Sequence, residues 1–363
     1  MSDIIISGYH GFANSGDEAL LWAIVDTLKK QKKDVSITVL SKKPAETARL
    51  YGVRSIYRYN LFKVHSEMKK ARLLLFGGGS LLQDITSSKS LYYYLVILRM
   101  AQKCKIKTML YANGIGPLIK PYNRKRATKV LNGVDVITLR DDMSDIELKG
   151  LNVTKPTIAI TADPAFTLEL KDKVSGKEFL ARAGVPKDVK IAVVSVRPWK
   201  HSAENFASAM ASLCDFMAEN YKIHPLFVPM QYPYDLPISN EIIGKMKQKA
   251  YLLDTELSVP DIFSVISCAE IIIGMRLHTL IYATTLEVPA MALVYDPKIS
   301  AFMESVNQPL CVNVDMMDEN ELKEKLNGLL SNTEQRKADL HETNVVLKEK
   351  AEENASYAIK LLS

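Results

Sequence analysis

Residues 73–80 have the sequence LLLFGGGS, in which four apolar residues run directly into three glycines and a serine. A short apolar stretch that ends in glycine is typical of a strand buried in a parallel sheet. Residues 271–278, IIIGMRLH, repeat this arrangement in the second half of the chain. Each stretch predicts a strand that turns into a helix, and together they predict one parallel sheet in each half.

The rest of the chain follows the same alternation. Short β-branched runs alternate with helical stretches through residues 1–320, which predicts parallel sheets with helices on both faces. We therefore expect an α/β fold of two Rossmann-like, doubly wound domains that face each other across a cleft. The expected parts are an N-terminal domain over 1–165, a C-terminal domain over 166–330 and a C-terminal helix over 331–363. Strands are expected at 3–7, 35–40, 55–57, 73–76, 107–112 and 136–139, and then at 191–196, 225–229, 251–253, 271–273 and 291–294.

The composition is that of a globular protein with ample core material. The 363 residues are 47% apolar and 24% charged, which excludes a disordered, collagen-like or coiled-coil chain. The four cysteines lie far apart, without the spacing that binds zinc. The longest apolar stretch, residues 91–98, is far shorter than the ~20 residues of a membrane helix, and the N-terminus lacks the features of a signal peptide. These features predict a cytoplasmic protein without a metal site.

The positive charge is concentrated in the first half of the chain. Residues 1–150 hold 25 Lys and Arg against 13 Asp and Glu, a balance of +12, whereas residues 151–363 hold 22 against 28, a balance of −6. A solvated surface explains many such clusters. Attraction to an anionic membrane surface is the functional alternative. Nucleic acid is not expected as a partner, because no RNA-binding signature or recognition-helix module is present.

Candidate ligand-binding residues follow the predicted strands, because ligands of open α/β sheets bind at the carboxyl ends of the strands. In the loop SGYHGFANSGDE, residues 7–18, Asn14 and Asp17 suit either a helix cap or contact with substrate hydroxyls. Gly78 and Gly79 expose backbone N–H groups before a predicted helix, although a plain tight turn explains them equally well.

Cations stand at several other predicted strand ends. Arg276 and His278 follow the strand at 271–273, and Arg140, Arg197 and Lys298 follow three other strands. Each could be an ordinary salt-bridge partner, and a lone histidine is often structural. If they converge, these cations would form a pocket for a small polyanion.

Four segments in this order resemble the polysaccharide pyruvyl transferase family, and most closely its bacterial cell-wall branch called CsaB. They are SGYHGFANSGDEALL (7–21), FGGGSLLQD (76–84), NGIGP (113–117) and GMRLHTL (274–280), and the resemblance spans roughly residues 4–310. It implies a fold similar to GT-B glycosyltransferases, without a metal or cofactor. It also implies transfer of a pyruvyl group from phosphoenolpyruvate to a sugar. In the CsaB branch the acceptor is a terminal N-acetylmannosamine of a lipid-linked secondary cell-wall polysaccharide precursor, and the product is a 4,6-ketal that anchors S-layer proteins.

The resemblance also implies roles for individual residues. His278 would be the catalytic acid/base, and Arg276, Arg140 and Lys298 would bind the donor. By their position we add Arg197 and Gln231 to the donor site, and we assign Asn14, Asp17, Gly78 and Gly79 to the acceptor site. The expected location is the cytoplasm, with peripheral contact at the inner face of the plasma membrane.

Two other functions remain open at this point. One is a GT-B glycosyltransferase that uses a nucleotide sugar, although no clear acidic residue for a ribose is present in the second domain. The other is a non-catalytic carbohydrate-binding protein, which the set of Arg276, His278, Arg140 and Lys298 argues against.

Overall fold

The computed structural model describes residues 2–85, 87–170 and 174–363, and the chain divides into two compact units. Unit 1 comprises residues 1–168 and 347–363, and unit 2 comprises residues 169–346. The division after residue 168 lies near the expected boundary at 165. Residues 347–363 join unit 1 instead of forming a separate part with the rest of the expected C-terminal helix.

Unit 1 is built on a seven-stranded sheet in which every pair of neighbours is parallel. The order is β3-β2-β1-β4-β5-β6-β7, so the chain reverses its direction of winding between β1 and β4. These central strands pair in register from Ile4 with Leu73 to Ser7 with Phe76. The strands are β1 (Ile4–His10), β2 (Ile37–Ser41), β3 (Arg54–Tyr57), β4 (Leu73–Gly77), β5 (Lys107–Asn113), β6 (Val136–Leu139) and β7 (Thr157–Ile160).

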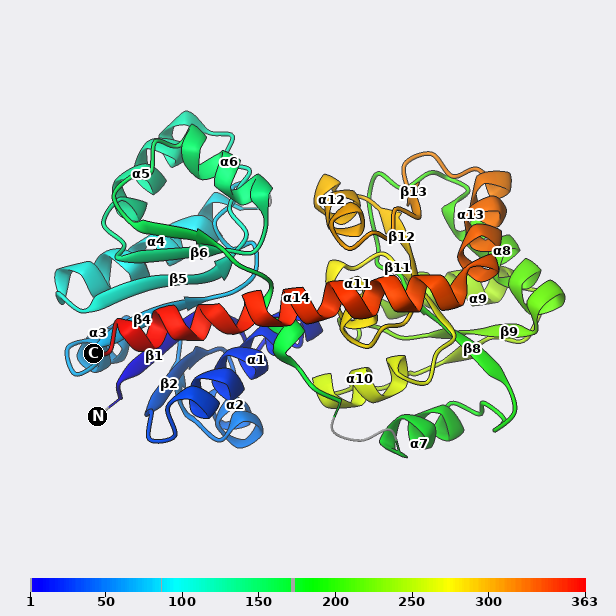
Figure 1. The fold of residues 1–363 in the computed structure, drawn as a ribbon, viewed down its shortest axis with the longest axis horizontal. Helices are drawn as coiled ribbons and strands as arrows, with labels where there is room; N and C mark the ends of the chain where they lie inside the picture. Colours follow the sequence, from blue (N-terminus) through cyan, green and yellow to red (C-terminus); the bar gives the residue numbers. More distant parts are fainter. Residues whose placement is uncertain (1, 86, 171–173) are drawn as a thin grey trace. The chain divides into compact units, whose positions relative to one another are not determined.

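Helices cover both faces of this sheet, and Figure 1 shows α4, α5 and α6 on one side and α1 and α2 on the other. One core packs α3 to α6 against the sheet, and a second core packs α1 against the opposite face. The helical elements are α1 (Ser15–Gln31), α2 (Pro44–Tyr51), α3 (Leu61–Met68), α4 (Ser88–Lys103), α5 (Pro121–Leu131), α6 (Asp142–Gly150) and the 3₁₀ helix η1 (Pro164–Thr167).

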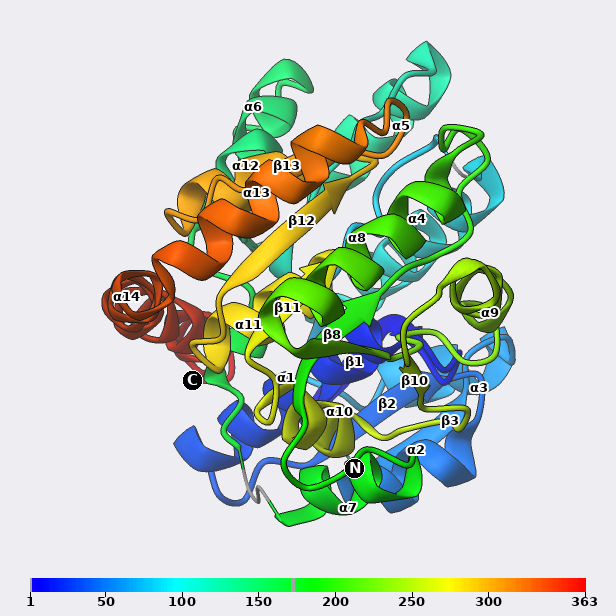
Figure 2. The same ribbon diagram turned by 90° about the vertical axis from the view of Figure 1, so that its right-hand side faces the viewer.

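Unit 2 repeats this plan with six parallel strands in the order β10-β9-β8-β11-β12-β13, and its winding reverses between β8 and β11. Figure 2 shows α8 and α13 in front of the sheet, and these helices share one apolar core with it. The strands are β8 (Lys190–Ser195), β9 (Ile223–Phe227), β10 (Tyr251–Leu252), β11 (Ile271–Gly274), β12 (Ala290–Val294) and β13 (Cys311–Asn313). The helices are α7 (Val174–Arg182), α8 (Phe206–Tyr221), α9 (Leu236–Lys245), α10 (Val259–Ile266), α11 (Leu277–Thr285), α12 (Pro297–Ser305) and α13 (Glu319–Ser331).

The last helix, α14 (Thr333–Lys360), begins in unit 2 and ends in unit 1. In unit 1, Ala355, Ala358 and Leu362 pack in the core that also holds α1. The buried Asn354 side chain donates a hydrogen bond to the Ala162 carbonyl and accepts one from the Thr161 hydroxyl. The C-terminal segment is therefore an integral part of unit 1.

The described residues contain neither a membrane-spanning helix nor a cluster of metal ligands. None of the helices there is long and apolar enough to cross a bilayer. No group of three or more His, Cys, Asp or Glu side chains in the same residues is arranged to hold a metal ion.

Candidate active site

Several of the predicted site residues lie where each sheet reverses its winding, which is where open α/β sheets bind ligands. Arg140, Gln231 and Lys298 instead follow β6, β9 and β12, away from these points. In unit 2, Arg197 follows β8, while Arg276 and His278 follow β11. In unit 1, Gly78 and Gly79 follow β4 directly. Arg140 belongs to unit 1, whereas the other predicted donor residues and His278 belong to unit 2.

Arg276 is held by a buried carboxylate that the sequence analysis did not select. Its Nε and Nη2 atoms donate hydrogen bonds to the two oxygens of Asp235 at 2.8 and 2.6 Å. The Asp235 side chain is fully buried. Such a two-point arginine–carboxylate contact fixes the plane of the guanidinium as well as its position.

The same carboxylate organises the loop after β9. Asp235 accepts a hydrogen bond from the Gln231 backbone N–H at 2.9 Å, and the Gln231 side-chain oxygen accepts one from Arg276 at 3.0 Å. The structure thus brings Gln231 and Arg276 into direct contact. Their contact with a donor substrate stays a prediction.

His278 is the second residue of α11, so its side chain lies at the start of a helix. The ring is half-buried, and its centroid lies 6.2 Å from that of Tyr282. The next residue, Thr279, joins α11 to β8 through a hydroxyl contact of 3.1 Å with Ser195. The Nε2 atom of His278 is buried, so the imidazole is partly enclosed by unit 2 while the residue as a whole stays half-buried.

Arg197 lies in an aromatic cluster at the ends of β8 and β12. Its Nη1 donates a hydrogen bond to the Tyr295 hydroxyl at 3.2 Å, and its guanidinium lies 5.1 Å from the centre of that ring. Trp199 packs against the same ring at 4.8 Å. Lys298 is a half-buried residue in the first turn of α12, three residues after Tyr295. No contact between Arg197 and Arg276 is described among these residues, so the structure places them at one sheet edge but not in one network.

Arg140 in unit 1 is also tied to a buried aspartate. Its side chain is 7% exposed, with Nη1 2.7 Å from Asp163 and Nε 3.7 Å from Asp141. Burial lowers the pKa of the guanidinium, but these two carboxylates outweigh burial and leave the pKa above its usual value. Nη2 donates a hydrogen bond to the Ser80 hydroxyl at 3.1 Å. Arg140 is thereby connected to the glycine loop that follows β4.

The predicted acceptor residues share the carboxyl edge of unit 1. Asn14 caps α1, because its side chain accepts a hydrogen bond from the Gly16 N–H at 3.1 Å. Gly78 and Gly79 adopt φ values of +56° and +73°, which residues other than glycine rarely adopt. A Cβ atom on Gly79 would lie 3.3 Å from Oδ1 of Asp17, so Asp17 adjoins this loop. The cap confirms one of the two interpretations of Asn14 and leaves acceptor binding untested.

Three further polar residues at this edge had not been selected from the sequence. His10 is the last residue of β1 and is buried. Burial, and to a smaller extent the charge of Arg58, lower the pKa of His10 to about 3, although a backbone hydrogen bond with Asp17 acts in the opposite direction. Arg58 donates a hydrogen bond to the Gly8 carbonyl and lies 4.5 Å from the centre of the Tyr93 ring. The side chain of Asn113, at the end of β5, is buried without a described hydrogen bond in this part of the chain.

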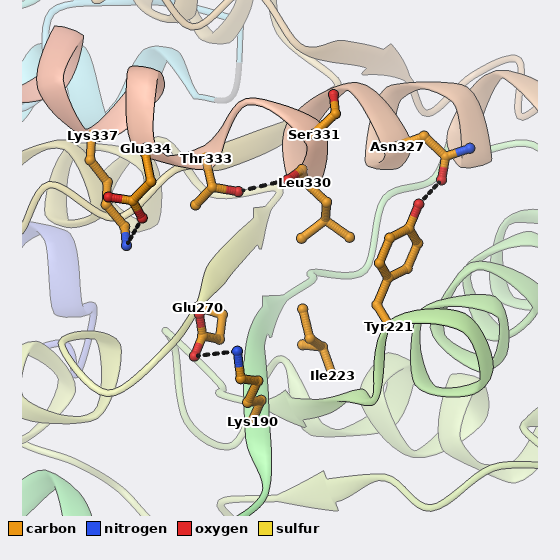
Figure 3. Close-up of a pocket in the computed structure, with 10 residues that line it drawn as sticks. All are labelled: Lys190, Tyr221, Ile223, Glu270, Asn327, Leu330, Ser331, Thr333, Glu334 and Lys337. Carbon is orange, nitrogen blue, oxygen red and sulfur yellow. Dashed lines mark hydrogen bonds and ion pairs between the residues drawn. The ribbon is translucent and has the colours of Figure 1, made fainter.

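The pocket drawn in Figure 3 lies elsewhere in unit 2 and has a volume of about 380 Å³. Lys190 and Ile223, which line it, stand at the beginnings of β8 and β9. Its charges balance, since Lys190 pairs with Glu270 at 3.6 Å and Lys337 with Glu334 at 3.1 Å. A pocket at the amino ends of the strands with balanced charge is a poor candidate for a site that binds a polyanion.

Comparison with solved structures defines the fold. The UDP-GlcNAc 2-epimerase of Neisseria meningitidis superposes with a TM-score of 0.68 at 12% identity, over 99% of this chain and 100% of that one. The S. aureus MnaA structure gives 0.69 at 13% identity, over 99% and 98%. The Anabaena HepE complex with UDP-glucose gives 0.67 at 10% identity, over 98% and 99%. These neighbours have the GT-B fold of glycosyltransferases and epimerases, which confirms the predicted fold class of two parallel-sheet α/β domains.

Comparison of sequences adds the family. The amylovoran biosynthesis protein AmsJ of Erwinia amylovora is 20% identical over 389 residues, which cover 92% of this chain and 93% of AmsJ. The profile of the polysaccharide pyruvyl transferases matches residues 14–297, most of the chain. The match includes three of the four segments that carry the resemblance and most of the first, while the CsaB branch is not distinguished by it. The chain is a transferase that belongs to the polysaccharide pyruvyl transferase family.

Proposed function

We propose that this enzyme transfers the pyruvyl group of phosphoenolpyruvate to a terminal N-acetylmannosamine of a lipid-linked secondary cell-wall polysaccharide precursor, as a 4,6-ketal. Membership of the family supports pyruvyl transfer to a polysaccharide in general. The observation that supports an anionic donor is the group at the carboxyl edge of β11, where Arg276 is fixed by Asp235 next to Gln231 and two residues before His278. The proposed acceptor rests on the resemblance to the CsaB branch. The product would be the S-layer anchor of the CsaB branch, made in the cytoplasm at the inner face of the membrane.

The charge of phosphoenolpyruvate requires a binding site with several hydrogen-bond donors and cations. Phosphoenolpyruvate carries about three negative charges on few atoms, and each charge-assisted hydrogen bond contributes roughly 1.5–3 kcal/mol. Arg276 keeps its Nη1 atom outside the described contact with Asp235, and Gln231 offers an amide beside it. Lys298, Arg197 and Arg140 are the other cations proposed for the donor.

The reaction consists of proton transfers around one carbon. His278 gives a proton to C3 of phosphoenolpyruvate, which makes C2 electrophilic. One sugar hydroxyl adds to C2, the C2–O bond to phosphate breaks, and the second hydroxyl closes the ketal ring. The two hydroxyl protons balance the step, since one replaces the proton that His278 gave to C3 and the other leaves with phosphate. Asn14, Asp17, Gly78 and Gly79 are proposed to hold the acceptor.

A mixing experiment tests this function. The enzyme is incubated with phosphoenolpyruvate and a lipid-linked disaccharide that ends in N-acetylmannosamine. We expect phosphate release that depends on the acceptor, and a product heavier by one pyruvate less one water in mass spectrometry. Several structural neighbours are complexes with UDP or a UDP-sugar. Transfer from a nucleotide sugar with no reaction of phosphoenolpyruvate would therefore replace this proposal by glycosyl transfer.

A further inference from the structure

A long segment of unit 1 carries positive charge without any acidic residue. Residues 85–134 contain ten lysines and arginines and no aspartate or glutamate. This segment includes α4 and α5, whose buried sides belong to one apolar core. Because neither helix has an acidic side chain, their outward side presents cations that no carboxylate within the segment neutralises.

The two helices form one continuous surface, which we call the α4–α5 face. The guanidinium of Arg126 on α5 lies 3.9 Å from the centre of the Tyr122 ring and 4.9 Å from that of Tyr92 on α4. The two rings are 6.5 Å apart. On α4, Lys89, Val96 and Arg99 are exposed at spacings that place them on the same side of the helix as Tyr92. Cationic and apolar side chains are therefore interspersed where the two helices meet.

A buried carboxylate brings two exposed isoleucines to the end of this face. Asp84 accepts hydrogen bonds from the N–H groups of Ile119 and Lys120 at 2.8 and 3.0 Å, and from the Asn123 amide at 2.8 Å. Ile85 directly follows Asp84, so the backbone at Ile85 lies in the segment that Asp84 joins to Ile119. The two side chains are 61% and 65% exposed. Asp84 thus links the two chain segments that carry these exposed aliphatic side chains.

This end of the face adjoins the proposed acceptor loop. Helices α4 and α5 begin at the carboxyl edge of the sheet, as Gly78 and Gly79 do. Leu82, between the glycines and α4, forms a β-bridge with Ile115, and the Gly114 N–H donates to the Gly79 carbonyl at 3.0 Å. A molecule held on the α4–α5 face would therefore reach this loop.

We propose that the α4–α5 face docks on an anionic lipid bilayer, so that a lipid-linked acceptor enters the acceptor loop directly from the membrane surface. The purpose of docking rests on the proposed function, but docking itself does not. Lysines and arginines are attracted to anionic headgroups, and exposed Ile85, Ile119 and Tyr122 suit the interface between headgroups and acyl chains. A nucleic acid would satisfy the charges but would leave the isoleucines without a matching surface.

The test measures sedimentation of the full chain with vesicles. We expect binding to vesicles of about 30% phosphatidylglycerol in phosphatidylcholine at about 0.1 M salt, and little binding to pure phosphatidylcholine. Lys125 is exposed on α5, three residues after Tyr122 and next to Arg126. Substitution of Lys125→Ser with Arg126→Ser should lower the partition coefficient about tenfold or more, because each cation near an anionic surface contributes about fivefold. Ile85→Ser with Ile119→Ser should lower it without changing its salt dependence.

The matched control removes the same charge from the other face of the sheet. Lys32 and Lys33 are exposed directly after α1, which packs on that face. Lys32→Ser with Lys33→Ser should leave vesicle binding within about twofold. An equal loss of vesicle binding in this control variant would overturn the proposal. Binding of the protein to double-stranded DNA, with no binding to anionic vesicles, would also overturn it.

A separate assay distinguishes this proposal from the proposed function. All these variants should keep normal turnover on a soluble disaccharide acceptor without lipid. Normal transfer with vesicle binding that ignores the substitutions would refute docking alone. Vesicle binding that follows the substitutions, with no transfer from phosphoenolpyruvate, would refute the proposed reaction alone.

Discussion

Each unit places a histidine at the carboxyl edge of its sheet, but the two have opposite surroundings. His10 in unit 1 is buried and has a pKa of about 3, so it is neutral at pH 7. His278 in unit 2 is half-buried at the start of a helix. A group that exchanges protons with a substrate must be reachable by it. Of the two, only the half-buried His278 is consistent with the proposed acid, and that role stays a prediction.

The arginines of the two edges are alike where the histidines differ. Arg140 pairs with Asp163 at 2.7 Å, and Arg276 pairs with Asp235 at 2.6 Å. In both units an aspartate that follows another strand of the same sheet thus fixes an arginine. Asp163 follows the neighbouring strand β7, whereas Asp235 follows β9, two strands away from β11. Such pairs set the orientation of the cation and are costly to break on one side only.

Among the proposed substitutions, that of His278 should have the largest effect on activity. We expect His278→Ala to lower kcat for pyruvyl transfer by about 10²–10⁴, the usual contribution of a general acid. Phosphate release under saturating substrates measures this change. The exposed His201 provides the control, since His201→Ala should keep normal turnover. A near-normal His278→Ala enzyme with an unchanged melting temperature would remove His278 from the mechanism.

Removal of the buried carboxylate in either unit should destabilise that unit. Asp235→Ala leaves the charge of Arg276 buried without its partner, and we expect a loss of about 3–5 kcal/mol in the free energy of unfolding, measured with urea. Asp163→Ala should act similarly through Arg140. The double variants Asp235→Ala with Arg276→Met and Asp163→Ala with Arg140→Met should recover part of the loss. Equal stability of single and double variants would show that the pairs are not coupled.

The buried histidine should make unfolding depend on pH. Folding lowers the pKa of His10 from its usual 6.5 to about 3, so the unfolded state binds a proton that the folded state excludes. Stability should therefore fall by about 1.4 kcal/mol per pH unit as the pH drops from 6.5 toward 3. The free energy of unfolding, measured with urea at several pH values, should depend less on pH for His10→Gln than for the natural chain. The same change at the exposed His201 should leave the slope as it is, and identical slopes for His10→Gln would contradict the assignment.

The smallest effect is expected when the guanidinium of Arg140 is replaced by the ammonium group of a lysine. Arg140→Lys keeps the charge but loses one of the two side-chain hydrogen bonds, to Asp163 or to Ser80. If Arg140 binds the donor, KM for phosphoenolpyruvate should rise about tenfold while kcat changes less. A parallel rise in the acceptor KM, with an unchanged donor KM, would move Arg140 to the acceptor site.

Much of the fold could be predicted from the sequence. Every predicted strand exists within a few residues of its predicted bounds. Most of these strands have apolar runs because they are buried on both faces, whereas the edge strand β3 has one buried side chain. The two strands that were not predicted, β7 and β13, each lie at an edge of a sheet. The side chains of β7 are half-buried or exposed, and β13 has only three residues, so neither has a strong apolar signal.

The site was harder to predict because its partners come from different strands. The sequence pointed to Arg140 and Arg276 by their place after strands, but nothing local marked Asp163 or Asp235 as their partners. Asp163 stands in an Ala-Asp-Pro segment next to the expected domain boundary at residue 165, where nothing marks it as a partner of Arg140. It also caps η1, by accepting a hydrogen bond from the Ala165 N–H at 3.0 Å. A contact between residues 23 or 41 positions apart has no signature in a single sequence.

The return of α14 to unit 1 has a consequence for how the protein is made. Unit 1 lacks the helix that carries Asn354, Ala355 and Ala358 until nearly the whole chain has left the ribosome. At about 5–20 residues per second, synthesis of the intervening residues 169–346 takes roughly 10–40 s. During that time the surface that α14 will cover is open to water and to chaperones. The N-terminal half of the protein is thus the first to be synthesised and the last to be completed.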